Sequence, residues 1–248
     1  MKKTTNQKGN VLFLILIAVA LFAALSYAVT QSSRSGGDAS RETNILNAAQ
    51  LTQYPTSVRT AVLRLVIDGY QDTQILFANP TSVIAGSASE AYQVFATIGG
   101  GAIYQNAPTD MMQAGGTNPT GQWFINMDFE IPELGRTSVA GLTGNELIAF
   151  LPGITESVCT RINLEANIIA NPSIANPVIG ADLSGGATGD FDRNLNLLSD
   201  YGSNSAILDN DTTAPFDGDF ARQPLGCFEN GTGAGDDNYV MYTVILER

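Results

Sequence analysis

The chemistry open to this chain must come from carboxylates and thiols, because its 248 residues include 24 Asp and Glu and two Cys but no His. The lack of histidine excludes histidine-based triads, histidine general bases and histidine-ligated metal sites. Two cysteines are too few for a cysteine-rich zinc or iron–sulfur site. Paired carboxylates such as Asp128 and Glu130 can hydrolyse a glycosidic bond, but nothing in the sequence indicates a cleft around them. We therefore expect a protein that is not an enzyme.

Acidic residues in the C-terminal third have the spacing and ligand chemistry that calcium prefers. Asp190, Asp192 and Asn194 follow one another like the first ligands of a calcium loop. Leu195 and Tyr201 stand where an EF-hand requires Gly and Glu, so this segment is not an EF-hand. A second acidic cluster consists of Asp209, Asp211, Asp217 and Asp219. All of these residues are candidate calcium ligands, and the alternative interpretation is that the loops are simply solvated.

Nucleotides and nucleic acids are not expected partners. The glycine-rich stretches at 99–101 and 231–235 precede no convincing helix of a βαβ unit and carry no phosphate-binding lysine. Their glycines instead indicate tight turns. The chain has 12 Lys and Arg against 24 Asp and Glu, a net charge of −12, whereas nucleic-acid binding needs a basic face.

The N-terminus combines a basic segment with a long apolar run. Residues 1–10 contain three lysines and no acid, and residues 11–25 contain no polar side chain. The run continues to Val29 and spans 19 residues, about 28 Å of helix, which is close to the hydrocarbon core of a bilayer. Because basic flanks stay in the cytoplasm, we expect export of the remainder, whose nine Arg and 24 acids give a net charge of −15.

Three routes of processing fit this segment. It can remain as a stable anchor, or it can be a secretory signal cleaved after Ala28, where Ser26 and Ala28 are suitably small. The third route is cleavage on the cytoplasmic side after Gly9, before the apolar run. A buried core helix does not fit, because the run has no polar face.

The third route corresponds to a family resemblance carried by Gln7-Lys8-Gly9-Asn10-Val11-Leu12-Phe13-Leu14-Ile15. This stretch resembles the class III prepilin signals of type IV pilins and type II secretion pseudopilins. The resemblance implies that Gly9 ends the leader, that Asn10 begins the mature protein and that the apolar helix is an assembly stem. Because Leu14 stands where major pilins carry Glu, the segment is most similar to those of minor pilins and the large tip pseudopilin.

Cys159 and Cys227 form an even pair in a chain expected to be exported. Oxidising compartments favour disulfides, and a catalytic cysteine would lack its usual histidine base. We therefore predict a disulfide that ties a helix over 155–169 to the strand or loop before the final hairpin.

The order of the remaining elements predicts an α+β protein with a hydrophobic transmembrane helix, a helical stalk and a head with an antiparallel sheet. We divide the chain into a basic leader (1–9), a transmembrane stem (10–29), a flexible linker (30–37) and an exported head (38–248), helical over 38–69 and β-rich over 70–248.

The helical segment over 38–69 has apolar residues at helical spacing. Pro55 is expected to kink it or divide it near Tyr54, and Gly69 is a plausible C-cap. Its apolar stripe fits a stalk that packs on filament neighbours or, as we favour, a helix that covers the sheet of the head.

Strands are predicted most clearly at 122–131, at 146–151 and at 239–246. Pro152 is expected to end the second of these strands, and the third should lie inside the sheet. Shorter candidate strands lie at 75–77, 83–84 and 102–104, and a helix is expected over 155–169 with Thr155 as its cap.

Together these features favour a structural, pilin-like subunit of a filament or of a secretion or pilus tip complex. It would be held in the inner membrane by residues 11–29, with a cytoplasmic N-terminus, a periplasmic or extracellular head and other pilin-like subunits as partners. The alternative is a secreted or anchored binding module for calcium or carbohydrate. No cofactor is expected apart from possible calcium.

Overall fold

The chain divides into two compact units, Met1–Thr43 and Asn44–Arg248. The computed structural model describes residues 8–32, 36–78, 88–116, 118–135, 145–168, 178–179, 206–208, 220–229 and 239–248. Within these ranges, no helix is both long enough and apolar enough to cross a membrane.

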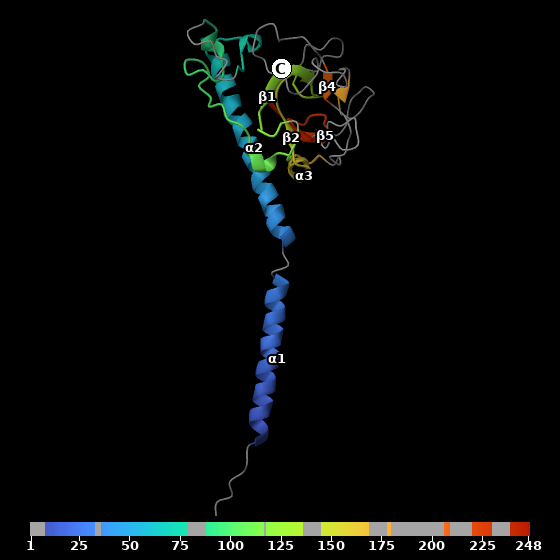
Figure 1. Cartoon of the computed structure of the whole chain (residues 1–248). Helices are drawn as coiled ribbons and strands as arrows, with labels where there is room; N and C mark the ends of the chain where they lie inside the picture. The colour runs from blue at the N-terminus through green and yellow to red at the C-terminus, as the bar shows by residue number, and fades with distance from the viewer. Residues whose placement is uncertain are drawn as a thin grey trace, which may run out of the picture. The chain divides into compact units, whose positions relative to one another are not determined.

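The first unit contains the helix α1 (Lys8–Ser32) and the start of α2 (Gly36–Ile67) (Figure 1). The leucines and alanines of α1 are strong helix formers. Residues 30–32 and 36–37 of the expected linker are helical, and 33–35 lie outside the described residues. The expected linker is therefore helical at both of its ends. Its small polar residues are compatible with this, because such residues are common at helix ends.

Helix α2 enters the second unit at Asn44 and continues unbroken through Pro55. Of the two effects expected of Pro55, the division near Tyr54 is therefore wrong, and the kink stays a prediction. Proline removes one backbone donor, and packing of the following turns holds the helix together. The predicted C-cap at Gly69 is confirmed by its φ of +99° and by two hydrogen bonds, from Gly69 N–H to the carbonyl of Val66 and from Tyr70 N–H to that of Leu65. This pair of bonds is a Schellman motif.

Among the described residues, three short 3₁₀ helices follow α2. They are η1 (Asp72–Gln74), η2 (Ala88–Tyr92) and η3 (Thr109–Met111). The short strands expected at 75–77 and 102–104 are not formed: Leu76 makes only an isolated bridge with Gln93, and 102–104 has no regular structure. Residues 83–84 lie outside the described residues.

The described strands form one six-stranded sheet in the order β3-β4-β1-β2-β6-β5. The strands and the helix between β2 and β3 have these bounds: β1 Phe124–Glu130, β2 Glu146–Ile154, α3 Glu156–Glu165, β3 Val178–Ile179, β4 Ala206–Leu208, β5 Leu225–Glu229 and β6 Tyr239–Leu246. All neighbours pair antiparallel except β1 and β4, which pair in parallel. The predictions of an α+β head, of β1 and of an interior C-terminal strand are confirmed.

The predicted end of the second strand at Pro152 is wrong, because β2 continues to Ile154. The register between β2 and β6 shifts between Pro152 and Ile154, and Gly153 adopts a φ of +81°. A β-bulge of this kind accommodates a proline that a regular ladder would exclude.

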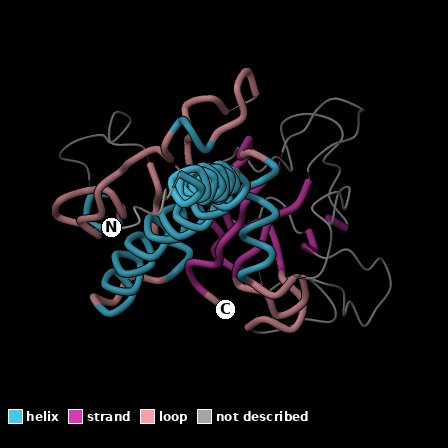
Figure 2. Tube along the Cα trace, turned by 90° about the horizontal axis from the view of Figure 1, so that it is seen from below, coloured by secondary structure: helices cyan, strands magenta, loops and turns pink. Residues whose placement is uncertain are grey.

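Both faces of the sheet are buried. Along β2, Leu147 and Leu151 belong to one core, together with Val58 of α2 and Ile162 of α3. These two helices lie beside the sheet (Figures 1 and 2). Ile148 and Phe150, which alternate with these leucines along β2, belong to a second core that is mainly aromatic. The second core contains Phe129, Phe150, Phe220, Phe228 and Tyr242. The favoured prediction for α2, a helix that covers the head's own sheet, is thus confirmed.

Candidate functional site

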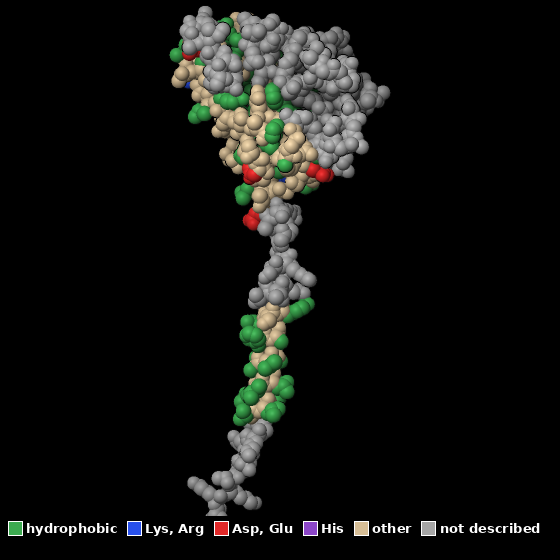
Figure 3. Space-filling model, in the orientation of Figure 1, with side chains coloured by type: hydrophobic (Ala, Val, Ile, Leu, Met, Phe, Trp, Pro, Cys, Tyr) green, Lys and Arg blue, Asp and Glu red, His purple; other side chains and the backbone are tan. Residues whose placement is uncertain are grey.

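Helix α1 presents an apolar surface on all sides. Its large apolar side chains between Val11 and Tyr27 are 40–73% exposed, and Figure 3 shows them along the helix in green. Burying one such side chain contributes about 1.5–3 kcal/mol, so a surface of this kind is stable in contact with lipid or with other apolar helices rather than with water. The predicted processing residues Gly9 and Asn10 lie in the first turn of this helix.

Two attachments join α3 to strand β5. The predicted disulfide between Cys159 and Cys227 is confirmed, with 5.4 Å between the Cα atoms. The side chain of Asn163 donates from Nδ2 to the carbonyl of Cys227 at 2.7 Å and accepts from its N–H at 2.8 Å. Because β5 lies at the edge of the described sheet, the amide of Asn163 takes the place of a neighbouring strand at this residue.

Helix α3 begins where Thr155 was expected to cap it, but the side chain of Thr155 makes no capping bond. Its carbonyl instead accepts from the N–H groups of Val158 and Cys159. The helix ends at Glu165 rather than at 169, and Asn167 follows with a φ of +57°. A left-handed residue of this kind is a common stop for a helix.

A buried carboxyl group lies where β1 and β2 meet. Glu146 is fully buried, and its Oε2 accepts from Ile131 N–H at 2.8 Å. Within the described residues, its Oε1 has no hydrogen-bond partner. Glu130, also buried, and the exposed Glu247 place further negative charge nearby. Glu146 was not among the residues predicted from sequence, although an acid at the start of an otherwise apolar strand was an available signal.

The environment of Glu146 strongly favours its protonated form. Burial raises the pKa of this carboxyl from its ordinary 4.5 to about 8, the hydrogen bond from Ile131 N–H opposes the rise, and Glu130 and Glu247 add to it. A neutral carboxyl at pH 7 can donate a proton, but Glu146 has no access to solvent. We therefore treat it as a determinant of stability rather than as a catalytic acid.

The predicted calcium ligands Asp190, Asp192, Asn194, Asp209, Asp211, Asp217 and Asp219 lie outside the described residues. In the parts of the chain that the structure covers, no three acidic or cysteine side chains are grouped so that they could hold a metal. The side chain of Asp128 is likewise not described, and its proposed catalytic companion Glu130 is buried. The calcium assignment therefore stays a prediction.

The glycines at 99–101 pack a tight loop against the end of α2. A Cβ on Gly99 would lie 2.2 Å from the carbonyl oxygen of Gln93, and one on Gly100 would lie 2.7 Å from that of Val94. These contacts leave no room for a side chain and explain the glycines without a bound phosphate. The second glycine-rich stretch, 231–235, lies outside the described residues.

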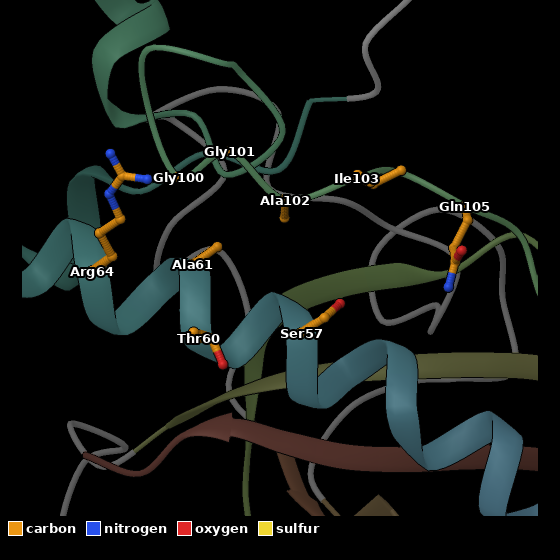
Figure 4. Close-up of a pocket in the computed structure, with 9 residues that line it drawn as sticks. All are labelled: Ser57, Thr60, Ala61, Arg64, Gly100, Gly101, Ala102, Ile103 and Gln105. Atoms are coloured by element: carbon orange, nitrogen blue, oxygen red, sulfur yellow. The ribbon is translucent and has the colours of Figure 1, made fainter.

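A pocket of about 570 Å³, open to solvent, lies between the same loop and α2. Its lining consists of Ser57, Thr60, Ala61, Arg64, Gly100, Gly101, Ala102, Ile103 and Gln105 (Figure 4). This pocket was not predictable from sequence, because it depends on how the loop packs on the helix.

Comparison of the chain with models of protein families, with curated proteins and with solved structures finds no match.

Proposed function

We propose that the chain is an exported, pilin-like structural subunit of a filament or of a secretion or pilus tip complex. The observation that carries this proposal is α1, an apolar helix whose large side chains are exposed around its whole circumference. A helix of this composition needs apolar surroundings, and the stems of neighbouring subunits or a lipid bilayer provide them.

The basic leader supports the same proposal. Lys2, Lys3 and Lys8 precede the apolar run, and no charged side chain interrupts residues 11–29. With the lysines in the cytoplasm, residues 11–29 hold the subunit in the inner membrane and the remainder is periplasmic or extracellular. Cleavage after Gly9 would leave Asn10 at the start of the stem, as the resemblance to prepilin signals implies.

The second unit suits an exported head. It contains a disulfide, which persists in oxidising compartments, and the exported part of the chain carries an excess of acids that favours solubility. In this proposal the head is the part that contacts partners, while the stem packs with other pilin-like subunits. The described residues suggest no reaction that the head would catalyse.

Mass-spectrometric mapping of the mature N-terminus in the native host tests the proposal. We expect the protein to begin at Asn10, and we expect a Gly9→Leu variant to keep its leader, because prepilin-type processing needs glycine at that position. A protein that begins at Val29 would have lost its stem and would refute the filament role. An intact Met1 would leave a simple anchor and would equally contradict the proposed processing.

A second candidate function is a secreted or anchored binding module without a filament role. The observation in its favour is the pocket beside Arg64, which offers a cation although the chain has a net charge of −12. Cleavage after Ala28 would support this alternative directly, because it would release the head as a soluble domain.

A further inference from the structure

The pocket beside Arg64 is a groove with an α-helix as one wall and a non-helical segment as the other. Ser57, Thr60 and Arg64 lie on successive turns of α2, and residues 100–105 run alongside them (Figure 4). Small residues keep the groove open: Ala61 and Gly100 form part of its lining, and a Cβ on Gly101 would lie 3.6 Å from Nη1 of Arg64.

The charge of the groove is opposite to that of the protein. Arg64 is the only charged residue among those that line it, although the whole chain has a net charge of −12. The side chain of Arg64 is 62% exposed, and its contact with Asp68 is loose, with 4.0 Å between Nε and Oδ2. Arg161 and Arg248 form closer ion pairs, at 3.0 and 2.7 Å. Arg64 therefore keeps much of its capacity to bind an additional carboxylate.

The polar groups of the groove also suit a peptide. The hydroxyls of Ser57 and Thr60 donate to the helix carbonyls of Tyr54 and Thr56, so their oxygens remain available as acceptors for N–H groups. The side chain of Ile103 is 79% exposed, and among the described residues its backbone has no hydrogen-bond partner. An extended peptide can donate its N–H groups to these hydroxyl oxygens and form hydrogen bonds with the backbone of Ile103. One of its side chains can at the same time cover the side chain of Ile103.

The groove is not built for a free chain terminus. The N–H groups of Gly100, Gly101 and Ala102 donate to the carbonyls of Gln93, Ala96 and Val94, respectively, so none is left to hold a terminal carboxylate. Because these three successive N–H groups are already used, an acidic side chain within a segment suits Arg64 better than a chain terminus.

We propose that this groove binds an extended peptide segment of a partner protein. An Asp or Glu of the segment pairs with Arg64, an apolar side chain covers Ile103, and the backbone bonds to Ile103 and to the hydroxyls of Ser57 and Thr60. This function goes beyond assembly through the stem. Because the groove lies wholly within the second unit, it does not depend on how the N-terminus is processed.

Selection from a displayed library of random 12-residue peptides tests the proposal, with the full chain held in non-ionic detergent as bait. We expect enriched peptides to share an acidic residue next to an apolar one. The best peptide, synthesised with capped ends, is then compared with its Asp→Asn or Glu→Gln version by fluorescence polarisation. Loss of the carboxylate should weaken binding about threefold, the range of an exposed ion pair.

Two variants in the groove and one control outside it locate the site. Arg64→Glu replaces attraction by repulsion and should weaken binding about tenfold, while Arg59→Glu on the same helix, outside the groove, should leave it unchanged. Ile103→Asp should also weaken binding. The fluorescence of Trp123, the only tryptophan and a core residue, checks that each variant is folded. Failure to enrich acidic peptides, or equal binding by Arg64→Glu, would overturn the proposal.

Discussion

Glu146 should make the stability of the head fall as pH rises. In the unfolded chain its carboxyl ionises near its ordinary pKa of 4.5, whereas the folded protein retains the proton up to about pH 8. Between these values the unfolded state binds fewer protons than the folded one, so each unit of pH lowers the free energy of unfolding by about 1.4 kcal/mol. Over the whole interval the loss approaches about 5 kcal/mol, a large part of the stability of an ordinary domain.

Denaturation of the full chain by urea in non-ionic detergent, at several pH values between 5 and 8.5, measures this effect. Trp123 is buried 5.4 Å from the ring of Tyr54, so its emission reports unfolding of this core. We expect the midpoint to be highest near pH 5 and to fall steadily towards pH 8. The disulfide should be kept oxidised throughout, so that protonation is the only variable.

The variant Glu146→Gln isolates the cause. Its side-chain oxygen can still accept from Ile131 N–H, but it has no proton to lose, so the slope between pH 5 and 8 should largely vanish. Glu156→Gln, an exposed glutamate at the start of α3, should keep the slope of the parent. A parent that is equally stable at pH 5 and pH 8, or a Glu146→Gln variant with the full slope, would refute this reasoning.

Two further predictions concern the attachment of α3 to β5. Replacing both Cys159 and Cys227 by Ala should lower the free energy of unfolding by up to about 4 kcal/mol, since the bridge joins residues 68 apart and restricts the unfolded chain; urea denaturation of the two proteins under non-reducing conditions measures this. Asn163→Ala should cost about 2–3 kcal/mol, because it leaves the N–H and carbonyl of Cys227 buried without their partners; a loss below about 0.5 kcal/mol in the same assay would contradict the role assigned to this amide.

Local patterns made several elements predictable. The stripe of apolar residues and Gly69 predicted α2 and its end, and alternation or continuous apolar character predicted β1, β2 and β6. The disulfide followed from the number of cysteines and the expected export. Each of these signals lies within one element or in the composition, so none depends on knowing which segments meet in the fold.

The features that sequence did not predict depend on contacts between distant segments. Strand β5 is short and contains a glycine, and it exists because β6 and α3 hold it. Pro152 ends no strand, because a bulge forms there only in the context of β6. The burial of Glu146 and the groove beside Arg64 likewise arise only when β1 and β2, or α2 and residues 100–105, are brought together.

The size of the individual effects identifies what holds the head together. The ion pairs of Arg64, Arg161, Arg222 and Arg248 are all partly exposed, and such pairs contribute at most about 1 kcal/mol each. The two apolar cores, the disulfide and Asn163 are therefore the main stabilising elements, and the buried Glu146 opposes them as pH rises. Glu146 retains its proton up to about pH 8 and oxidising surroundings keep the disulfide closed, so the head should be most stable in an oxidising compartment below that pH. Oxidising conditions of this kind prevail outside the cytoplasm, which is where the proposed function places the head.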